Sequence, residues 1–144
     1  MRNFFRTATI AALVSSLIGP VGLAQQAEIT QLKNPAPTQV LFVGNSYFYY
    51  NDSLHNHVNR LVQAHDEELA ERIAYKSATI GGASLSHHDV AAHLQAGKLG
   101  LDEPFDLVIL QGGSGEPLRD SRRETFKRVA AEHAQTIRAT DAEV

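Results

Sequence analysis

The chain has 144 residues, 13 basic and 16 acidic side chains, a net charge of −3 at pH 7 and no cysteine. An acidic chain without a long basic run is a poor partner for nucleic acid, because phosphate binding needs clustered Lys and Arg. The lack of cysteine excludes disulfides, thiolate catalysis and Cys-based zinc sites. The length suits one small domain with its own core.

The first 24 residues have the pattern of a secretory signal peptide. Arg2 and Arg6 form a basic start, residues 7–18 are uncharged, and a Gly-Pro pair precedes a small-residue ending at Ala24. The apolar run is shorter than the about 20 residues that a membrane span requires. We therefore expect export to the bacterial periplasm or the medium, with cleavage after Ala24 and no membrane attachment afterwards. An N-terminal anchor or a buried helix is the alternative.

Residues 25–38 are largely polar and contain Pro35 and Pro37, so they predict a flexible lead-in. Residues 39–43 are apolar after the first position, which is typical of a strand buried on both faces of a parallel sheet. Ser53 is then placed to cap a helix. One face of that helix carries the apolar residues Leu54, Val58, Leu61 and Val62.

The rest of the chain alternates strands and helices. Residues 73–80 predict a second strand, 87–95 a short helix, and 105–110 a third strand. A final helix is expected over residues 120–138, with a stripe made by Phe126, Val129, Ala130, His133 and Ile137. Residues 142–144 resemble the start of a fourth strand. This order predicts an α/β fold with a parallel sheet, and a chain that stops within the fold.

Three turns rich in glycine and small hydroxyl residues follow the three predicted strands. They are Gly44-Asn45-Ser46, residues 81–84 and residues 111–115. Ligands of open parallel sheets bind beyond the carboxyl ends of the strands. Each turn alone is most simply an ordinary loop, but three in succession predict a binding or active site at that edge.

The first two turns carry a family resemblance. The segment Val-Leu-Phe-Val-Gly-Asn-Ser at residues 40–46, followed by Tyr-Phe-Tyr-Tyr-Asn-Asp, resembles the opening block of SGNH/GDSL hydrolases, in the branch with Gly-Asn-Ser. Residues 80–85, Ile-Gly-Gly-Ala-Ser-Leu, are similar to the second block. The similarity spans residues 39–118 and implies a three-layer, flavodoxin-like fold in residues 39–144. It also implies Ser46 as nucleophile and an oxyanion hole that includes the N–H groups of Ser46 and Gly82, with Gly81 as second choice.

The third turn departs from the family pattern. Most members have Gly-x-Asn-Asp here, and the Asn side chain donates to the oxyanion, whereas this chain has Gln111-Gly-Gly-Ser114-Gly. Gln111 is our first choice for the third donor, and Ser114 is the alternative if Gly112 is aligned with the motif's glycine. A third interpretation is that Gln111 only braces the loop. The turn lacks the Gly-Lys-Ser/Thr ending of a phosphate loop, so no nucleotide or other cofactor is expected. A metal site at His55 and His57, or at His88, Asp89 and His93, is an alternative, but neither set has the helix pair with a carboxylate of a zinc protease, so no metal is expected.

A serine hydroxyl needs a base, normally a histidine oriented by a carboxylate. In the family this pair lies in an Asp-x-x-His block near the C-terminus, and no such block occurs at the end of this chain. Asp52 and His55 have the same spacing but lie in the continuation of the opening block. The other histidines, including His87, His88 and His93, are expected on the surface. We therefore expect a fragment of a domain that is inactive or impaired, unless a partner chain supplies the histidine.

The resemblance implies an exported serine esterase that hydrolyses O-acyl esters, with acetyl or short acyl groups, through an acyl-Ser46 intermediate. A small-molecule or carbohydrate ester is the expected substrate. The alternative is a non-catalytic exported binding module with a degenerate pocket of the same kind. Acyl specificity, alcohol specificity and oligomeric state are not determined by the sequence.

Overall fold

The computed structural model describes residues 30–144, and from residue 31 onward they form one compact unit. The predicted signal peptide lies outside the described residues. Three strands form one sheet: β1 (Gln39–Gly44), β2 (Ala74–Thr79) and β3 (Leu107–Leu110). Their order is β2-β1-β3, and both pairings are parallel. The prediction of an α/β fold with a parallel sheet is confirmed.

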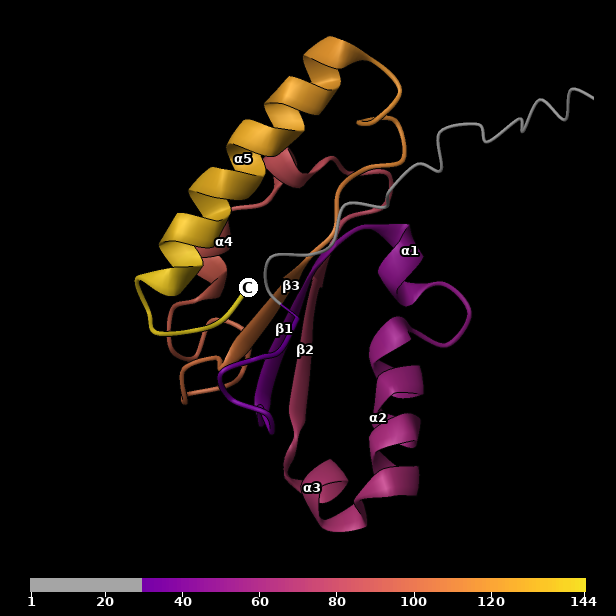
Figure 1. The fold of residues 1–144 in the computed structure, drawn as a ribbon, viewed down its shortest axis with the longest axis vertical. Coiled ribbons are helices and arrows are strands. Elements are labelled where there is room, and N and C mark those ends of the chain that lie inside the picture. The colour runs from indigo at the N-terminus through magenta and orange to yellow at the C-terminus, as the bar shows by residue number, and fades with distance from the viewer. Residues whose placement is uncertain (1–29) are drawn as a thin grey trace, which may run out of the picture. The chain divides into compact units, whose positions relative to one another are not determined.

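Helices cover both faces of the sheet (Figure 1). On one face lie α1 (Ser46–Tyr49), α2 (Leu54–His65) and α3 (Glu67–Arg72). On the other lie α4 (Val90–His93) and the long α5 (Asp120–Arg138), with a 3-10 turn, η1 (Leu85–His87), before α4. The sheet and its two helical layers make a small open α/β sandwich.

The central strand β1 is buried from Val40 to Gly44, because its apolar side chains alternate between two cores. Leu41 and Val43 face α5 and join a cluster with Val108 and Ile137. Phe42 faces α1 and α2, and its ring packs edge-on against Phe48 at a centroid distance of 5.3 Å. The cluster on the α5 face is the larger one.

The start of the third strand differs from the sequence prediction. Strand β3 begins at Leu107 rather than at residue 105, although Phe105 is buried. The carboxylate of Asp106 instead accepts hydrogen bonds from Thr38 N, Thr38 Oγ1 and Gln39 N. Burial alone would raise the pKa of Asp106, but these three bonds outweigh it and hold the pKa below 3.8. This carboxylate therefore ties the start of β1 to the start of β3.

The predicted helix over residues 87–95 is wrong as one continuous element. It consists of η1 and α4, separated at His88 and Asp89. Asp89 has extended backbone and caps α4, because its Oδ1 accepts a hydrogen bond from Ala92 N at 3.0 Å. The capping residue thus starts a new helix where the apolar periodicity indicated a continuation.

Ser53 lies at the N-terminal end of α2, as predicted, but its backbone carbonyl rather than its side chain accepts the first hydrogen bonds of the helix. Ser53 precedes α2, but its side chain makes no capping bond, and its φ of +56° lies in the left-handed region. Asn51 and Asp52 have positive φ as well. A left-handed backbone conformation is energetically unfavourable for residues other than glycine, and here three such residues occur in succession. They form the turn between α1 and α2.

The C-terminal residues lie beside β3. Glu143 forms an isolated parallel bridge with Leu107, at the position expected for a fourth strand. The Glu143 carboxylate also accepts hydrogen bonds from the backbone N–H groups of Lys33 and Asn34. Part of the predicted lead-in is thereby joined to the end of the chain.

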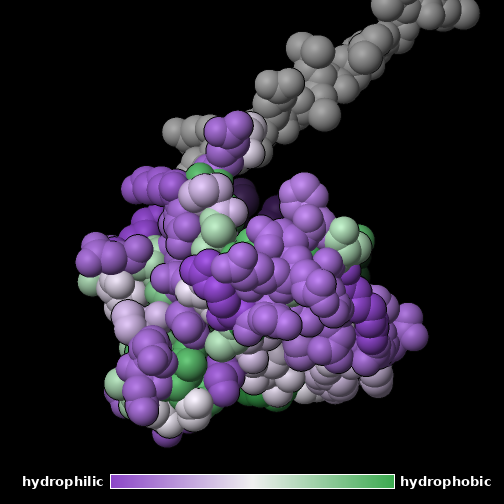
Figure 2. All heavy atoms as spheres, turned by 90° about the horizontal axis from the view of Figure 1, so that it is seen from below, coloured by the Kyte–Doolittle hydropathy of each residue, from purple (hydrophilic) through white to green (hydrophobic). Residues whose placement is uncertain are grey.

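In residues 30–144 no helix is long and apolar enough to cross a membrane, and the face shown in Figure 2 is largely hydrophilic.

Candidate functional site

Asn45 connects all three turns at the carboxyl edge of the sheet. Its side chain is 3% exposed, and Nδ2 donates to Ala83 O at 2.9 Å and Gly112 O at 3.1 Å. Its Oδ1 accepts from Tyr47 N, which caps α1. One amide group therefore holds together the turns after β1, β2 and β3, as an amide can because it both donates and accepts.

Gln111 completes this network from the end of β3. Its Oε1 accepts from Asn45 N at 3.0 Å, and its Nε2 donates to Asn45 Oδ1 and Gly112 O, both at 3.0 Å. Both amide hydrogens of Gln111 are thus engaged within the network. A Cβ at Gly44 would lie 2.6 Å from Gln111 Oε1, so glycine is required for this close approach. The bracing role considered for Gln111 matches this geometry.

A pocket of about 490 Å³ opens where the three turns meet. Ser46 and Gly82 both line it, and so does the third turn through residues 113–115. The remaining lining residues are Asn45, Tyr47, Tyr50, Ser84 and Arg122. Gln111 does not line the pocket, whereas the alternative donor Ser114 does. The predicted convergence of three small-residue turns is therefore present, with Gln111 behind the pocket wall.

The backbone N–H groups of Ser46 and Gly82 are among those of the pocket residues that have no hydrogen-bond partner within residues 30–144. Ser46 is the first residue of α1, so its N–H has no partner within the helix. Among the described residues, neither Ser46 N nor Gly82 N donates a backbone hydrogen bond outside helices and strands. Gly82 has φ +70°, a conformation that glycine adopts without strain. In the turn after β2, the N–H of Gly82 is therefore left without a hydrogen-bond partner among the described residues.

No histidine or carboxylate of the described residues lines this pocket. His55 lies over β2, where its Nδ1 is 3.2 Å from Ser77 Oγ, and Asp52 pairs with Arg60 instead of His55. The Asp52–His55 dyad is therefore absent. His133 Nε2 is 3.3 Å from Leu85 O, on the α5 side of the sheet.

His88 and His93 are not surface residues, which corrects the expectation for this pair. His88 is 5% exposed, and His93 is half-buried 6.2 Å away, centroid to centroid. Within the described residues both ring nitrogens of His88 and Nδ1 of His93 lack hydrogen-bond partners. Burial lowers the pKa of both rings; for His88 the neighbouring His93 acts in the same direction and the Gly44 carbonyl in the opposite one. No group of three or more possible metal ligands occurs in residues 30–144.

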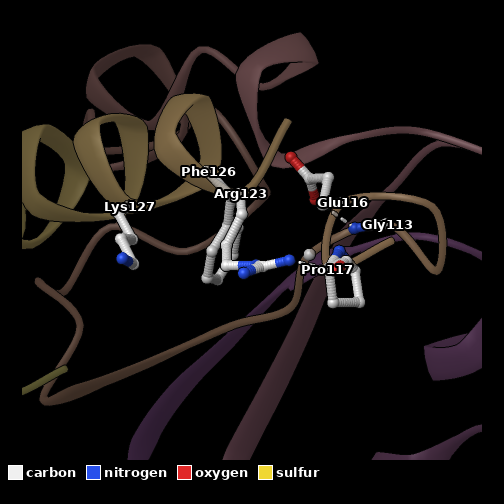
Figure 3. Close-up of a pocket in the computed structure, with 7 residues that line it drawn as sticks. Gly113, Glu116, Pro117, Arg123, Phe126 and Lys127 are labelled. Carbon is white, nitrogen blue, oxygen red and sulfur yellow. Dashed lines mark hydrogen bonds between the residues drawn. The ribbon is translucent and has the colours of Figure 1, made fainter. Parts of the chain in front are cut away.

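A second pocket of about 320 Å³ lies between the third turn and α5 (Figure 3). Phe126 provides an apolar wall, and the Arg123 side chain points toward Pro117, donating to its carbonyl oxygen at 3.1 Å. The carboxylate of Glu116 is buried and accepts a hydrogen bond from Gly113 N. Glu116 thus fixes the third turn at Gly113, which lines both pockets.

The chain matches no family model, no curated protein and no solved structure. What the fold defines directly is a small α/β protein with a three-stranded parallel sheet. The site residues that sequence reasoning missed are Asn45 as the connecting side chain, Arg122 as a pocket residue and Glu116 as a brace. Asn45 lies within the motif that pointed to Ser46. Arg122 gave no signal in the sequence, because it lies in the final helix, outside all three turns.

Proposed function

We propose that the chain is an SGNH-type serine esterase with a flavodoxin-like fold, exported and acting on O-acyl esters through an acyl-Ser46 intermediate. Acetyl and short acyl groups on a small alcohol or a carbohydrate are the proposed substrates. The observation that supports this most strongly is the single pocket lined by Ser46, Gly82 and the third turn, at the carboxyl ends of parallel strands.

The geometry of the pocket fits acyl transfer. The hydroxyl of Ser46 gives its proton to a base and attacks the ester carbonyl, whose oxygen becomes an oxyanion. The free N–H groups of Ser46 and Gly82 are the proposed donors to that oxygen, and one donor can lower the barrier by about 3 kcal/mol. Collapse of the tetrahedral intermediate breaks the ester C–O bond and releases the alcohol, which takes up the proton, and water then hydrolyses the acyl-Ser46 ester. Gln111 holds Asn45 in place, and a direct donation from Gln111 would require one of its present bonds to break. Ser114 is the third donor that the pocket favours.

The proposed reaction also needs a base for the Ser46 proton, and no histidine among residues 30–144 lines the pocket. Acylation is therefore a better first readout than turnover. The chain is incubated with p-nitrophenyl acetate and imidazole as an added base, and the acetylated residue is identified by peptide mass mapping. We expect acetylation at Ser46, stimulated by imidazole, and none at that peptide in Ser46→Ala.

Ser84→Ala is the matched control, because Ser84 lines the same pocket but lies on the turn after β2. This variant should acylate like the parent chain. Acetyl transfer to lysines alone, or acylation of Ser84 in preference to Ser46, would contradict the proposal.

The second candidate is a binding module, favoured by the lack of any described histidine or carboxylate on the pocket wall. Such a module holds the ester through the same amides without reacting. Saturable binding of an ester to the pocket, together with an unreactive Ser46 in the presence of imidazole, would decide for this alternative.

A further inference from the structure

Among the residues of the described range 30–144 that line the Ser46 pocket, Arg122 is the only charged one. It lies in the first turn of α5, which carries its side chain to the edge of the third turn. Arg122 thus brings one positive charge to the pocket wall, and the buried Glu116 carboxylate, which does not line the pocket, accepts a hydrogen bond from Gly113 N.

Three other cations of α5 are paired. Arg123 bonds to Asp120, Lys127 to Glu124 and Arg128 to Glu132. Arg122 forms no ion pair with any carboxylate of residues 30–144. The two acidic residues closest to it in sequence, Asp120 and Glu124, are engaged by Arg123 and Lys127. The guanidinium of Arg122 is therefore left available to a ligand.

The third turn makes room for this guanidinium. A Cβ at Gly115 would lie 3.0 Å from Arg122 Nη1, so the lack of a side chain at Gly115 allows the close approach. Gly115 lines the pocket as well. Tyr47 and Tyr50, exposed by 63% and 68%, form another part of its wall and leave room for a ligand longer than an acetyl group.

We propose that the substrate of this pocket is an anionic ester, one that carries a carboxylate beside the ester group, and that Arg122 binds this carboxylate. The proposal rests on the proposed function for the ester chemistry, but anion binding by Arg122 is measured separately from it. A guanidinium binds a carboxylate through two parallel N–H donors, which selects for a planar anion rather than for a neutral group of similar size.

The test compares two esters that differ by one charge. The ¹⁵N-labelled chain is titrated with monomethyl succinate and with dimethyl succinate, and the amide signals of Gly82 and Gly113 report binding in the pocket. Because Arg122 is exposed, we expect a preference of about fivefold for the monoanion, which decreases as salt is added. Arg122→Gln should remove the preference and leave the affinity for dimethyl succinate unchanged.

Arg128→Gln is the matched control. It removes one positive charge from α5 at an exposed position outside the pocket, so the preference should persist. Equal affinities for the two esters in the parent chain, a preference that survives in Arg122→Gln, or no pocket response to monomethyl succinate would each overturn the proposal. Loss of the preference in Arg122→Gln with an unreactive Ser46 would support anion binding and remove only the esterase function.

Discussion

The most informative single change is Asn45→Asp, which replaces the donor of the connecting amide by a second acceptor. The side chain of Asn45 makes four hydrogen bonds, and Nδ2 donates two of them to the Ala83 and Gly112 carbonyls. A carboxylate would lose both and face two carbonyl oxygens in a position that is 3% exposed. The substitution keeps the shape of the side chain, so any effect reports on the donor and the charge.

The magnitude follows from these contacts. Each lost hydrogen bond costs about 1 kcal/mol, and leaving the Ala83 and Gly112 carbonyls unsatisfied beside a buried charge adds a desolvation penalty. We expect Asn45→Asp to lower the free energy of unfolding by about 3–5 kcal/mol at neutral pH. A small domain has only about 5–15 kcal/mol in total, so the variant should be close to unfolding.

The pH dependence gives a second check on Asn45→Asp. Burial and the facing carbonyls raise the folded-state pKa of the introduced carboxyl above its unfolded value of about 3.9. The penalty is then full above the folded pKa and shrinks as the pH falls through it, because protonation removes the charge and restores a donor. The difference between variant and parent chain should therefore be smaller at about pH 5 than at about pH 7.

Urea unfolding followed by circular dichroism measures both effects, and Gln63→Glu on the exposed surface of α2 is the matched amide-to-carboxylate control. That control should unfold within about 0.5 kcal/mol of the parent chain. If Asn45→Asp behaved like Gln63→Glu at neutral pH, the bonds from Nδ2 would not hold the three turns together, and the reasoning from Asn45 would be refuted.

Three further predictions concern the fold around the site. Gly112→Ala would place a Cβ 2.7 Å from the Phe126 ring, so the free energy of unfolding should fall by about 1–3 kcal/mol, measured by urea unfolding. The pKa of Asp106 is lowered from 3.8, so the hydrogen bonds of its carboxylate stabilise the fold above about pH 3.8, and this stability is lost as the pH falls through the folded-state pKa. Asp106→Asn should therefore make the urea unfolding midpoint less sensitive to pH in that acid range. Burial lowers the pKa of His88, so below about pH 6.5 the unfolded chain takes up a proton that the folded chain does not, and stability declines; His88→Leu should flatten this decline between about pH 6.5 and pH 5.

Each of these has its own control. Ser114→Ala, on the exposed part of the third turn, should leave the urea midpoint unchanged, in contrast to Gly112→Ala. For the acid-dependent changes, Asp102→Asn and His65→Leu remove exposed groups of the same types. If Asp106→Asn and Asp102→Asn gave the same dependence of stability on pH, the hydrogen-bonded carboxylate of Asp106 would not govern acid sensitivity. If His88→Leu and His65→Leu gave the same dependence, the buried ring of His88 would not govern it.

The sequence by itself determined the strands, the long helix and the position of the three turns. Periodicity alone predicts that residues 39–43 are buried on both faces and that residues 120–138 form a helix, because both patterns record which side chains must avoid water. Since the ends of parallel strands share one edge, the sequence also predicted that Ser46 and Gly82 would meet. These two residues line one pocket.

Only the tertiary structure decided what the polar side chains at that edge do. Gln111 and Asn45 are far apart in sequence, and their mutual hydrogen bonds depend on the β1–β3 register, which no local pattern encodes. In the same way, Arg122 reaches the pocket only because α5 packs across the sheet, and His88 is buried because the chain breaks into two short helices beside it. The burial of β1 and of one face of α5 follows from local apolar patterns, whereas hydrogen-bond partners are set by which distant backbone groups the packed core brings within reach.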